Sequence, residues 1–286
     1  MKGLVQQMQI ETQELKSNEQ PFLVTAYWLD PIADFEVPVK QPVMIICPGG
    51  GFTFHSERET APIALKFLAE GMHVLVLPYQ LRDTTHEVYP MALNQVARTI
   101  EWVTEQTGRH SIDTDRIVLT GFSAGGHVVA NYNGIATNPL LVKQYHLDQY
   151  TGQHAAIILA YPVIDLDAGF PTTSAEKNLI TQDSQFWHAQ TNVTDNAKPA
   201  FVWQTATDEL VPAENSLRYV LALQKHHIPV EYHLFGSGIH GLSLATHVTQ
   251  KPGKTKYLNK GASQWISLAT NWLTQIQVFI ITNDYY

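Results

Sequence analysis

Short runs of mostly apolar residues recur along the chain, and they constrain its fold more than any other feature of the sequence. A run such as 42–47 (PVMIIC) has apolar side chains at successive positions, so a strand formed there must be covered on both faces. Longer stretches with apolar residues at helical spacing separate the runs, as in 90–106, where Leu93, Val96 and Ile100 recur. This alternation predicts an α/β fold with a central, mostly parallel sheet and helices on both faces.

The runs and the stretches between them place the expected elements. Strands are expected at 22–29, 42–47, 73–79, 116–122, 155–165, 199–206 and 230–235, the first of them at an antiparallel edge. Helices are expected at 60–69, 90–106, directly after Ser123, at 216–227 and at 263–277. We expect one domain over residues 1–286, in which the long segment 166–198 is a cap-like insertion over the sheet edge.

The charge balance excludes several kinds of partner. The formal net charge is −8 and Lys and Arg cluster nowhere, so neither a nucleic-acid-binding nor a membrane-binding surface is expected. No apolar run reaches the roughly 20 residues of a membrane-spanning helix, and Glu11 and Glu14 lie where a signal peptide would be apolar. Cys47 is the single cysteine, which rules out an internal disulfide and suits a reducing compartment. We therefore expect a cytoplasmic protein.

A serine flanked by glycines is the candidate nucleophile. Residues 121–125 read GFSAG, at the end of the predicted strand 116–122 and directly before a predicted helix. A strand that turns sharply into a helix leaves almost no space for side chains two positions before and after the turn, where the glycines stand. Such a turn holds Ser123 in a strained backbone conformation and exposes its hydroxyl at the carboxyl edge of the sheet.

Three consecutive glycines follow the predicted strand 42–47 after one proline. The segment 47–52 reads CPGGGF, which has more glycine than an ordinary tight turn needs. A backbone without Cβ atoms can approach a substrate carbonyl closely and donate N–H groups to its oxygen. We expect this loop to form part of an oxyanion hole.

The acid of a catalytic triad should follow a later strand, because open α/β sheets place their chemistry at the carboxyl ends of strands. Asp208 follows the predicted strand 199–206 and is the favoured candidate. Asp165 follows the preceding strand, one connection earlier, and Glu209 adjoins Asp208 and could substitute for it.

The base should come last in the chain, and the segment 236–241 (GSGIHG) contains a histidine there. Its glycines also spell the G-x-G-x-x-G of a dinucleotide-binding loop, but such a loop needs an acidic residue about 20 positions further on. The next acidic residue is Asp284, so we reject the nucleotide interpretation. His127 lies on the helix after Ser123, which directs it away from the hydroxyl, and His240 is the predicted base.

Neither a cofactor nor a metal ion is expected. No group of His, Cys and Asp has the H-E-x-x-H or C-x-x-C spacing of a metal site. Cys47 ends a strand before a proline and is interpreted as a small buried side chain rather than a nucleophile. His55 follows the glycine loop and is expected near the entrance of the site.

Four segments in this order, CPGGGF, GFSAGGH, TATDE and GSGIHG, resemble those of the small α/β-hydrolase carboxylesterases related to the hormone-sensitive-lipase and acetyl-xylan-esterase groups. The resemblance spans roughly residues 20–275. It implies that Ser123 is the nucleophile, Asp208 the acid and His240 the base of a serine esterase without a cofactor.

The resemblance also implies which backbone groups form the oxyanion hole. They are the amides of Gly50 or Gly51 and of Ala124. Many lipase-like relatives have His-Gly-Gly-Gly in this loop, whereas Pro48 stands at the histidine position here. This difference shifts the likeness toward the short-chain esterases.

Compact members of that group usually hydrolyse small acyl esters, often acetyl esters, so the resemblance implies a small-molecule ester substrate and an acyl-enzyme intermediate. The bulky residues Phe52, Phe54, Leu210 and Ile239 flank the catalytic segments. They are expected either to shorten the acyl pocket or to pack in the core.

Two other functions remain open. One is a peptidase of the same scaffold, like the catalytic domain of prolyl oligopeptidases, and the other is a hydrolase-fold binding protein without catalysis. The apolar C-terminal stretch 277–286 permits a homo-oligomer.

Overall fold

The computed structural model describes residues 8–32 and 39–279. The strands are β1 (Met8–Ser17), β2 (Gln20–Leu29), β3 (Gln41–Cys47), β4 (His73–Val76), β5 (Ile112–Phe122), β6 (Ala156–Ala160), β7 (Ala200–Thr205) and β8 (Val230–Phe235). The α-helices are α1 (Ala61–Ala69), α2 (Met91–Glu105), α3 (Ala124–Ile135), α4 (Pro139–Gln144), α5 (Ser174–Ile180), α6 (Glu214–Lys225) and α7 (Trp265–Gln275).

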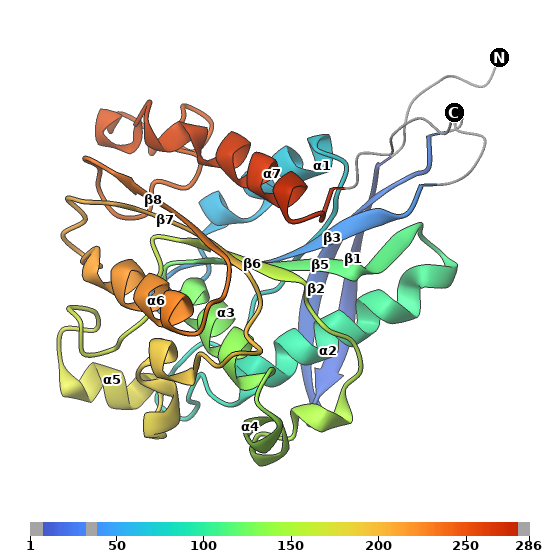
Figure 1. Cartoon of the computed structure of the whole chain (residues 1–286), viewed down its shortest axis with the longest axis horizontal. Helices are drawn as coiled ribbons and strands as arrows, with labels where there is room; N and C mark the ends of the chain where they lie inside the picture. The colour runs from blue at the N-terminus through green and yellow to red at the C-terminus, as the bar shows by residue number, and fades with distance from the viewer. Residues whose placement is uncertain (1–7, 33–38, 280–286) are drawn as a thin grey trace.

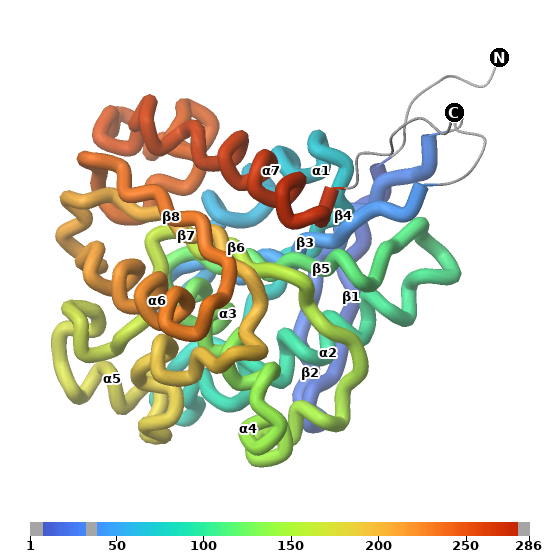
Figure 2. The backbone as a smooth tube through the Cα atoms, in the orientation of Figure 1, coloured from blue at the N-terminus to red at the C-terminus, as the bar shows by residue number. Residues whose placement is uncertain are grey.

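The eight strands form one sheet in the order β1-β2-β4-β3-β5-β6-β7-β8. Strands β3 to β8 are mutually parallel, whereas β2 is antiparallel to both β1 and β4. Figure 2 shows the β1–β2 hairpin on the far side of the sheet from β7 and β8. Parallel strands direct their carboxyl ends to a common edge, and the loops that leave β3, β5, β7 and β8 meet there.

Helices cover both faces of the sheet because both faces are apolar. Every residue of β4, β6 and β7 is buried. Helices α1 and α7 cover one face, and α2, α3 and α6 cover the other (Figure 1). The fold class predicted from the alternating apolar runs is therefore confirmed.

The elements themselves differ from the sequence prediction in a few places. Strand β1 was not predicted, because its residues are mostly polar and its order depends on its pairing with β2. The predicted strand 155–165 is shorter, since the backbone turns at Tyr161 (φ 39°). The segment 166–198 contains the short helix α5, which its sequence did not indicate.

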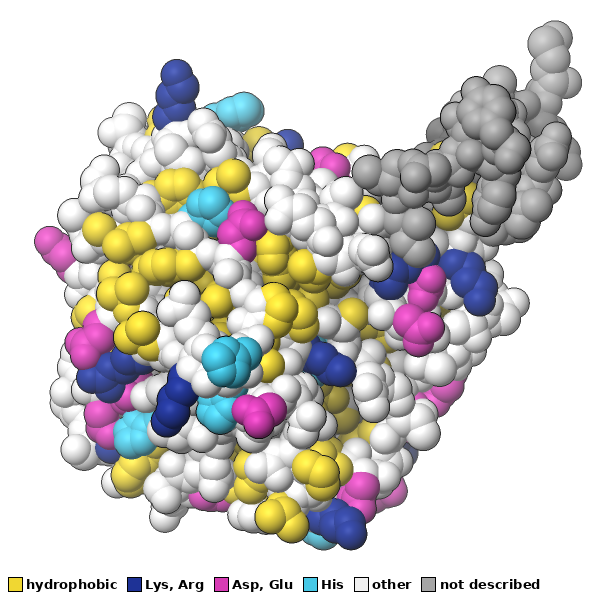
Figure 3. Space-filling model, viewed as in Figure 1, with side chains coloured by type: hydrophobic (Ala, Val, Ile, Leu, Met, Phe, Trp, Pro, Cys, Tyr) yellow, Lys and Arg dark blue, Asp and Glu magenta, His cyan; other side chains and the backbone are white. Residues whose placement is uncertain are grey.

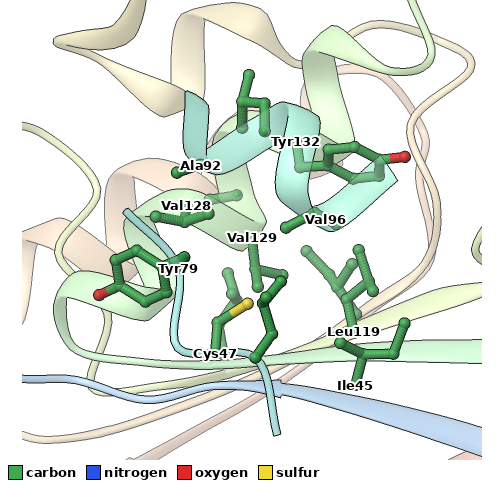
Figure 4. Close-up of a cluster of buried hydrophobic side chains, with 14 of the residues drawn as sticks. Ile45, Cys47, Tyr79, Ala92, Val96, Leu119, Val128, Val129 and Tyr132 are labelled. Atoms are coloured by element: carbon green, nitrogen blue, oxygen red, sulfur yellow. The ribbon is translucent and has the colours of Figure 1, made fainter. Parts of the chain in front are cut away.

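The thiol of Cys47 lies in the core between β3 and α3. Figure 4 shows it among Ile45, Val128 and Val129. Burial raises the pKa of this thiol to about 12, so the reactive thiolate does not form near neutral pH. The residue packs as a small apolar side chain.

Charged side chains of both signs lie on the surface (Figure 3). On the face shown in Figure 3, Lys and Arg side chains are interspersed with Asp and Glu. Within residues 8–32 and 39–279, no helix is both long and apolar enough to cross a bilayer. Of the C-terminal stretch that permits association, residues 280–286 lie outside the described residues.

Two buried histidines, His127 and His154, lie beside the sheet. His127 Nδ1 lies 2.7 Å from the Tyr89 hydroxyl, and His154 Nε2 lies 2.9 Å from Asn133 Oδ1. Burial lowers the pKa of each ring to about 3, and the charge of Lys198 contributes at His154. The folded protein therefore holds both rings neutral, whereas the unfolded chain binds protons to them below a pH of about 6.5.

This difference predicts a loss of stability in acid. As the pH falls from about 7 to about 5, each ring should lower the free energy of unfolding by about 2 kcal/mol. Replacing His154→Gln should remove about half of this combined loss, measured by urea unfolding at both pH values. The exposed His247→Gln serves as the control and should keep the full loss. The same acid loss in both variants would contradict the assignment.

Candidate active site

Ser123 lies in the sharp turn between β5 and α3. Its backbone has φ 51° and ψ −116°, a conformation that non-glycine residues rarely adopt. A Cβ on Gly121 would lie 2.5 Å from the Gly125 carbonyl oxygen, and a Cβ on Gly125 would lie 2.1 Å from the Cys47 carbonyl oxygen. Both positions require glycine because backbone atoms approach them closely, as the GFSAG pattern predicted.

The structure brings Ser123, His240 and Asp208 into one chain of hydrogen bonds. Ser123 Oγ lies 2.7 Å from His240 Nε2, and His240 Nδ1 lies 2.7 Å from Asp208 Oδ2. The other oxygen of Asp208 accepts the backbone N–H groups of Leu210 and Val211. A carboxylate only accepts, so His240 donates from Nδ1, and Nε2 of the neutral ring is left to accept the serine proton.

The other candidate acids lie away from His240. The Asp165 carboxylate bonds to Arg218, to the Gln190 side chain and to the Asp167 amide. Glu209 is exposed, whereas the side chain of Asp208 is completely buried against His240. The geometry therefore favours Asp208 as the partner of the histidine.

The glycines around His240 let its loop pack on the end of β7. Gly238 has φ 152°, and a Cβ there would lie 2.7 Å from Thr205 Cγ2. The hydroxyls of Thr205 and Thr207 both donate to its carbonyl oxygen. Gly241 also has a positive φ, of 72°. These contacts fix the loop that holds the imidazole.

The glycine loop after β3 has unused backbone donors beside Ser123. Gly49 N–H donates to Glu59, but among the described residues no protein acceptor bonds to the amides of Gly50 and Gly51. Gly50 has φ 138°, and a Cβ on it would lie 1.8 Å from the Phe54 carbonyl oxygen. Ala124 is the first residue of α3, so its amide has no partner within the helix.

Ser123 and His240 border a cleft of about 760 Å³. Apolar side chains contribute part of its wall, including Phe54 and Leu210, which are 59% and 50% exposed. His55 also lines it, as its position after the glycine loop suggested. The remaining lining side chains are mostly polar or charged, namely Thr53, Ser56, Glu57, Arg58, Glu59, Arg82, Glu176, Lys251 and Tyr257.

Of the four residues expected in the acyl pocket or in the core, Phe52 and Ile239 pack in or against the core. Phe52 is completely buried and packs edge-on against the His127 ring, 5.7 Å between centroids. Ile239 packs against the core on the α7 side of the sheet and does not line the cleft. Both positions follow from the path of the backbone, which the order of residues does not reveal.

The segment 166–198 supplies wall residues that the sequence did not single out. Phe170, Pro171, Glu176 and Ile180 all line the cleft. The Phe170 ring lies over the glycine loop, with Cζ 3.4 Å from where a Cβ on Gly51 would be. The only sequence signal was the unusual length of this connection.

One group of residues has the composition of a metal site. Oxygen and nitrogen atoms of Asp165, Asp167 and His188 lie within 4.8 Å of one another. However, Arg218 pairs with Asp165, and Lys177 pairs with Asp167 at 2.6 Å. These cations already neutralise the carboxylates, so we assign no metal there.

Comparison with known proteins identifies the family. A family model described as BD-FAE matches residues 33–223. The chain belongs to the BD-FAE family of α/β-hydrolases. This match confirms the resemblance to small α/β-hydrolase carboxylesterases and places the chain among carboxylic ester hydrolases.

Several solved structures resemble the chain over nearly its whole length. The carboxylesterase Cest-2923 from Lactobacillus plantarum is 60% identical, with a TM-score of 0.95 over 96% of this chain and 100% of that one. An acetyl ester-xyloside bifunctional hydrolase from Caldicellulosiruptor lactoaceticus is 28% identical, with a TM-score of 0.74 over 91% of this chain and 90% of that one.

Curated relatives are longer proteins. Endo-1,4-beta-xylanase B of Butyrivibrio fibrisolvens is 30% identical over 72% of this chain, which spans 33% of that protein. Esterase LipQ of Mycobacterium tuberculosis is 26% identical over 65% of this chain, which spans 46% of that protein. The chain thus spans between a third and a half of the length of these two relatives.

The close approach at Gly125 predicts the effect of a single methyl group. Gly125→Ala should force the turn or the end of β3 to move, and a displacement of about 1 Å at a reacting group costs roughly 100-fold in rate. We expect ester hydrolysis to fall by at least about that factor, measured as kcat/KM. Gly108→Ala is the matched control, because a Cβ there meets no atom within 4 Å and should leave the rate unchanged. Equal activity of the two variants would contradict this account of the turn.

Proposed function

We propose that this protein is a serine carboxylesterase that hydrolyses short-chain esters, chiefly acetyl esters, through an acyl-enzyme intermediate. The observation that supports this most directly is the Ser123–His240–Asp208 hydrogen-bond chain at the border of an open cleft. The amides of Gly50, Gly51 and Ala124 add the donors that an acyl-transfer site needs.

In the proposed reaction, Ser123 Oγ attacks the ester carbonyl while His240 Nε2 accepts its proton. The backbone amides stabilise the negative oxygen of the tetrahedral intermediate. His240 then gives the proton to the departing alcohol, and a water molecule activated by the same nitrogen releases the acid. Asp208 holds the imidazole in the required tautomer and stabilises its protonated form.

The lining of the cleft supports a small acyl group and a polar alcohol. Phe54, Leu210 and Phe170 are bulky and line the same cleft as Ser123, where they can restrict the length of the acyl chain. Apart from the buried Glu59, the charged and hydroxyl-bearing lining residues can hydrogen-bond to an alcohol that has several hydroxyl groups. The structural neighbour named as an acetyl ester-xyloside hydrolase agrees with such a substrate.

The nucleophile is tested by Ser123→Ala. We expect this variant to keep the fold and to lose at least about 99% of its turnover of an aryl acetate, because the remaining groups give only residual catalysis. It should also fail to react with a fluorophosphonate probe that labels the unaltered protein. The exposed Ser184→Ala is the control and should keep both activities. Labelling of Ser123→Ala would discard the assignment, and faster cleavage of an aminoacyl anilide than of the aryl acetate would favour a peptidase.

The acyl limit is tested with a series of esters from acetyl to octanoyl. We expect kcat/KM to fall at least about tenfold along the series, since one methylene too many against a hydrophobic pocket wall costs about 1–3 kcal/mol. Phe170→Ala and Leu210→Ala should each reduce this fall, whereas Leu140→Ala, 80% exposed and outside the cleft, should not. Equal rates for acetyl and octanoyl esters in the unaltered protein would refute the proposed limit.

A further inference from the structure

Glu59 has a buried carboxyl group that lies between the glycine loop after β3 and the loop that holds His240. Only 3% of the residue is exposed. One carboxyl oxygen accepts the Gly49 N–H at 2.8 Å, and the other accepts the Tyr161 hydroxyl at 2.6 Å. Gly49 belongs to the glycine loop after β3, whereas Tyr161 directly follows β6.

Tyr161 extends this connection to the loop that holds His240. Its hydroxyl oxygen accepts the Ser243 N–H at 3.0 Å. Its ring lies 5.1 Å from the His240 ring, with the two planes at 73°. These buried hydrogen bonds therefore connect two loops through Glu59 and Tyr161. One is the glycine loop after β3, called the oxyanion loop, and the other is the loop that holds His240 and Ser243, called the base loop.

A second side chain strengthens the same junction. Arg58, the neighbour of Glu59, donates from its guanidinium to the carbonyl oxygen of Gly241 at 2.8 Å, directly after His240. The Ser243 hydroxyl donates back to the Arg58 carbonyl oxygen. The segment that holds Glu59 is thus also bonded to the loop of His240 through the side chain and the backbone of Arg58.

The glycine loop is shaped to receive this carboxyl group. A Cβ on Gly49 would lie 2.7 Å from the Glu59 oxygen and 3.0 Å from Ser123 Cβ, so glycine is required between them. The Tyr79 hydroxyl fixes the adjoining peptide by donating to the Pro48 carbonyl oxygen at 3.0 Å. The position of the glycine loop relative to Ser123 therefore depends on the side chains of Glu59 and Tyr79.

Keeping a carboxyl group at this depth is costly. Burial raises the pKa of Glu59, and the hydrogen bonds from Tyr161 and Gly49 partly oppose that rise. The triad does not use Glu59, and an apolar residue would avoid the desolvation cost. A carboxylate has two oxygens that can each accept a hydrogen bond, so Glu59 can hold two donors from different loops in place.

We propose that Glu59 is a positioning residue for catalysis, which holds the oxyanion loop in register with the loop of His240 by accepting Gly49 N–H and Tyr161 O–H together. The proposal rests on the proposed esterase function of the same site. It assigns Glu59 no contact with the reacting atoms.

The test is Glu59→Gln, because an amide keeps the size of the side chain but has one oxygen acceptor instead of two. One of the two donors then faces an NH₂ group, and the loop must shift. We expect kcat for an aryl acetate to fall at least about tenfold, with KM changed less than about twofold, since a displaced oxyanion loop weakens binding of the transition state more than of the substrate. The exposed Glu70→Gln removes a carboxylate from the end of α1 and should change neither constant.

Tyr161→Phe removes only the hydroxyl and tests the same connection from its other side. Its kcat should also fall, and the double variant should lose no more than Glu59→Gln alone, because both changes break one chain of bonds. Tyr161→Phe remains informative if Glu59→Gln fails to fold. Fully additive losses would overturn the proposal.

Other results separate the alternatives. A lowered melting temperature with unchanged kcat would give Glu59 a structural role only, and a raised KM with unchanged kcat would make it a substrate-binding group; either result overturns the proposal. If the esterase function itself is wrong, Ser123→Ala keeps its activity. If only this inference is wrong, Ser123→Ala is inactive while Glu59→Gln matches the unaltered protein.

Discussion

The site depends on a close approach of backbone to backbone at the carboxyl edge of the sheet. The turn after β5 passes so near the end of β3 that Gly125 faces the Cys47 carbonyl oxygen without space for a Cβ. This approach places Ser123 beside the glycine loop, so the hydroxyl and the free amides share one region of the cleft. A larger residue at either glycine of the turn would separate them.

The buried sheet gives these loops a rigid support. Strands with apolar residues on both faces are covered by helices, and their carboxyl ends are held in register by pairing across β3, β5, β6, β7 and β8. Asp208 follows β7 and His240 follows β8, two neighbouring strands of this set, and their side chains lie within hydrogen-bond distance. Burial of the Asp208 side chain also keeps water from competing for its hydrogen bonds.

Sequence reasoning succeeded where one local requirement dictates one residue type. The turn at Ser123 needs glycines on both sides, and the pattern located it. The sequence left open whether a bulky residue beside the catalytic segments lines the cleft or packs in the core. Phe52 and Phe54 are two positions apart in a glycine-rich loop, yet the first packs in the core and the second lines the cleft. The irregular backbone of that loop, with positive φ at Gly50, Gly51 and Phe52, removes the periodicity on which such a distinction depends.

By itself, the sequence determined the fold class and the three side chains that form the hydrogen-bond chain, because apolar runs and glycine-bounded turns follow from local sterics and burial. Only the tertiary structure decided which residues form the cleft wall and that a buried Glu59 links the loop of Gly49 to that of His240 through Tyr161. Gly49, Glu59, Tyr161 and Ser243 come from four separate segments. Their contacts depend on how strands and loops pack in space, and no spacing along the chain encodes that packing.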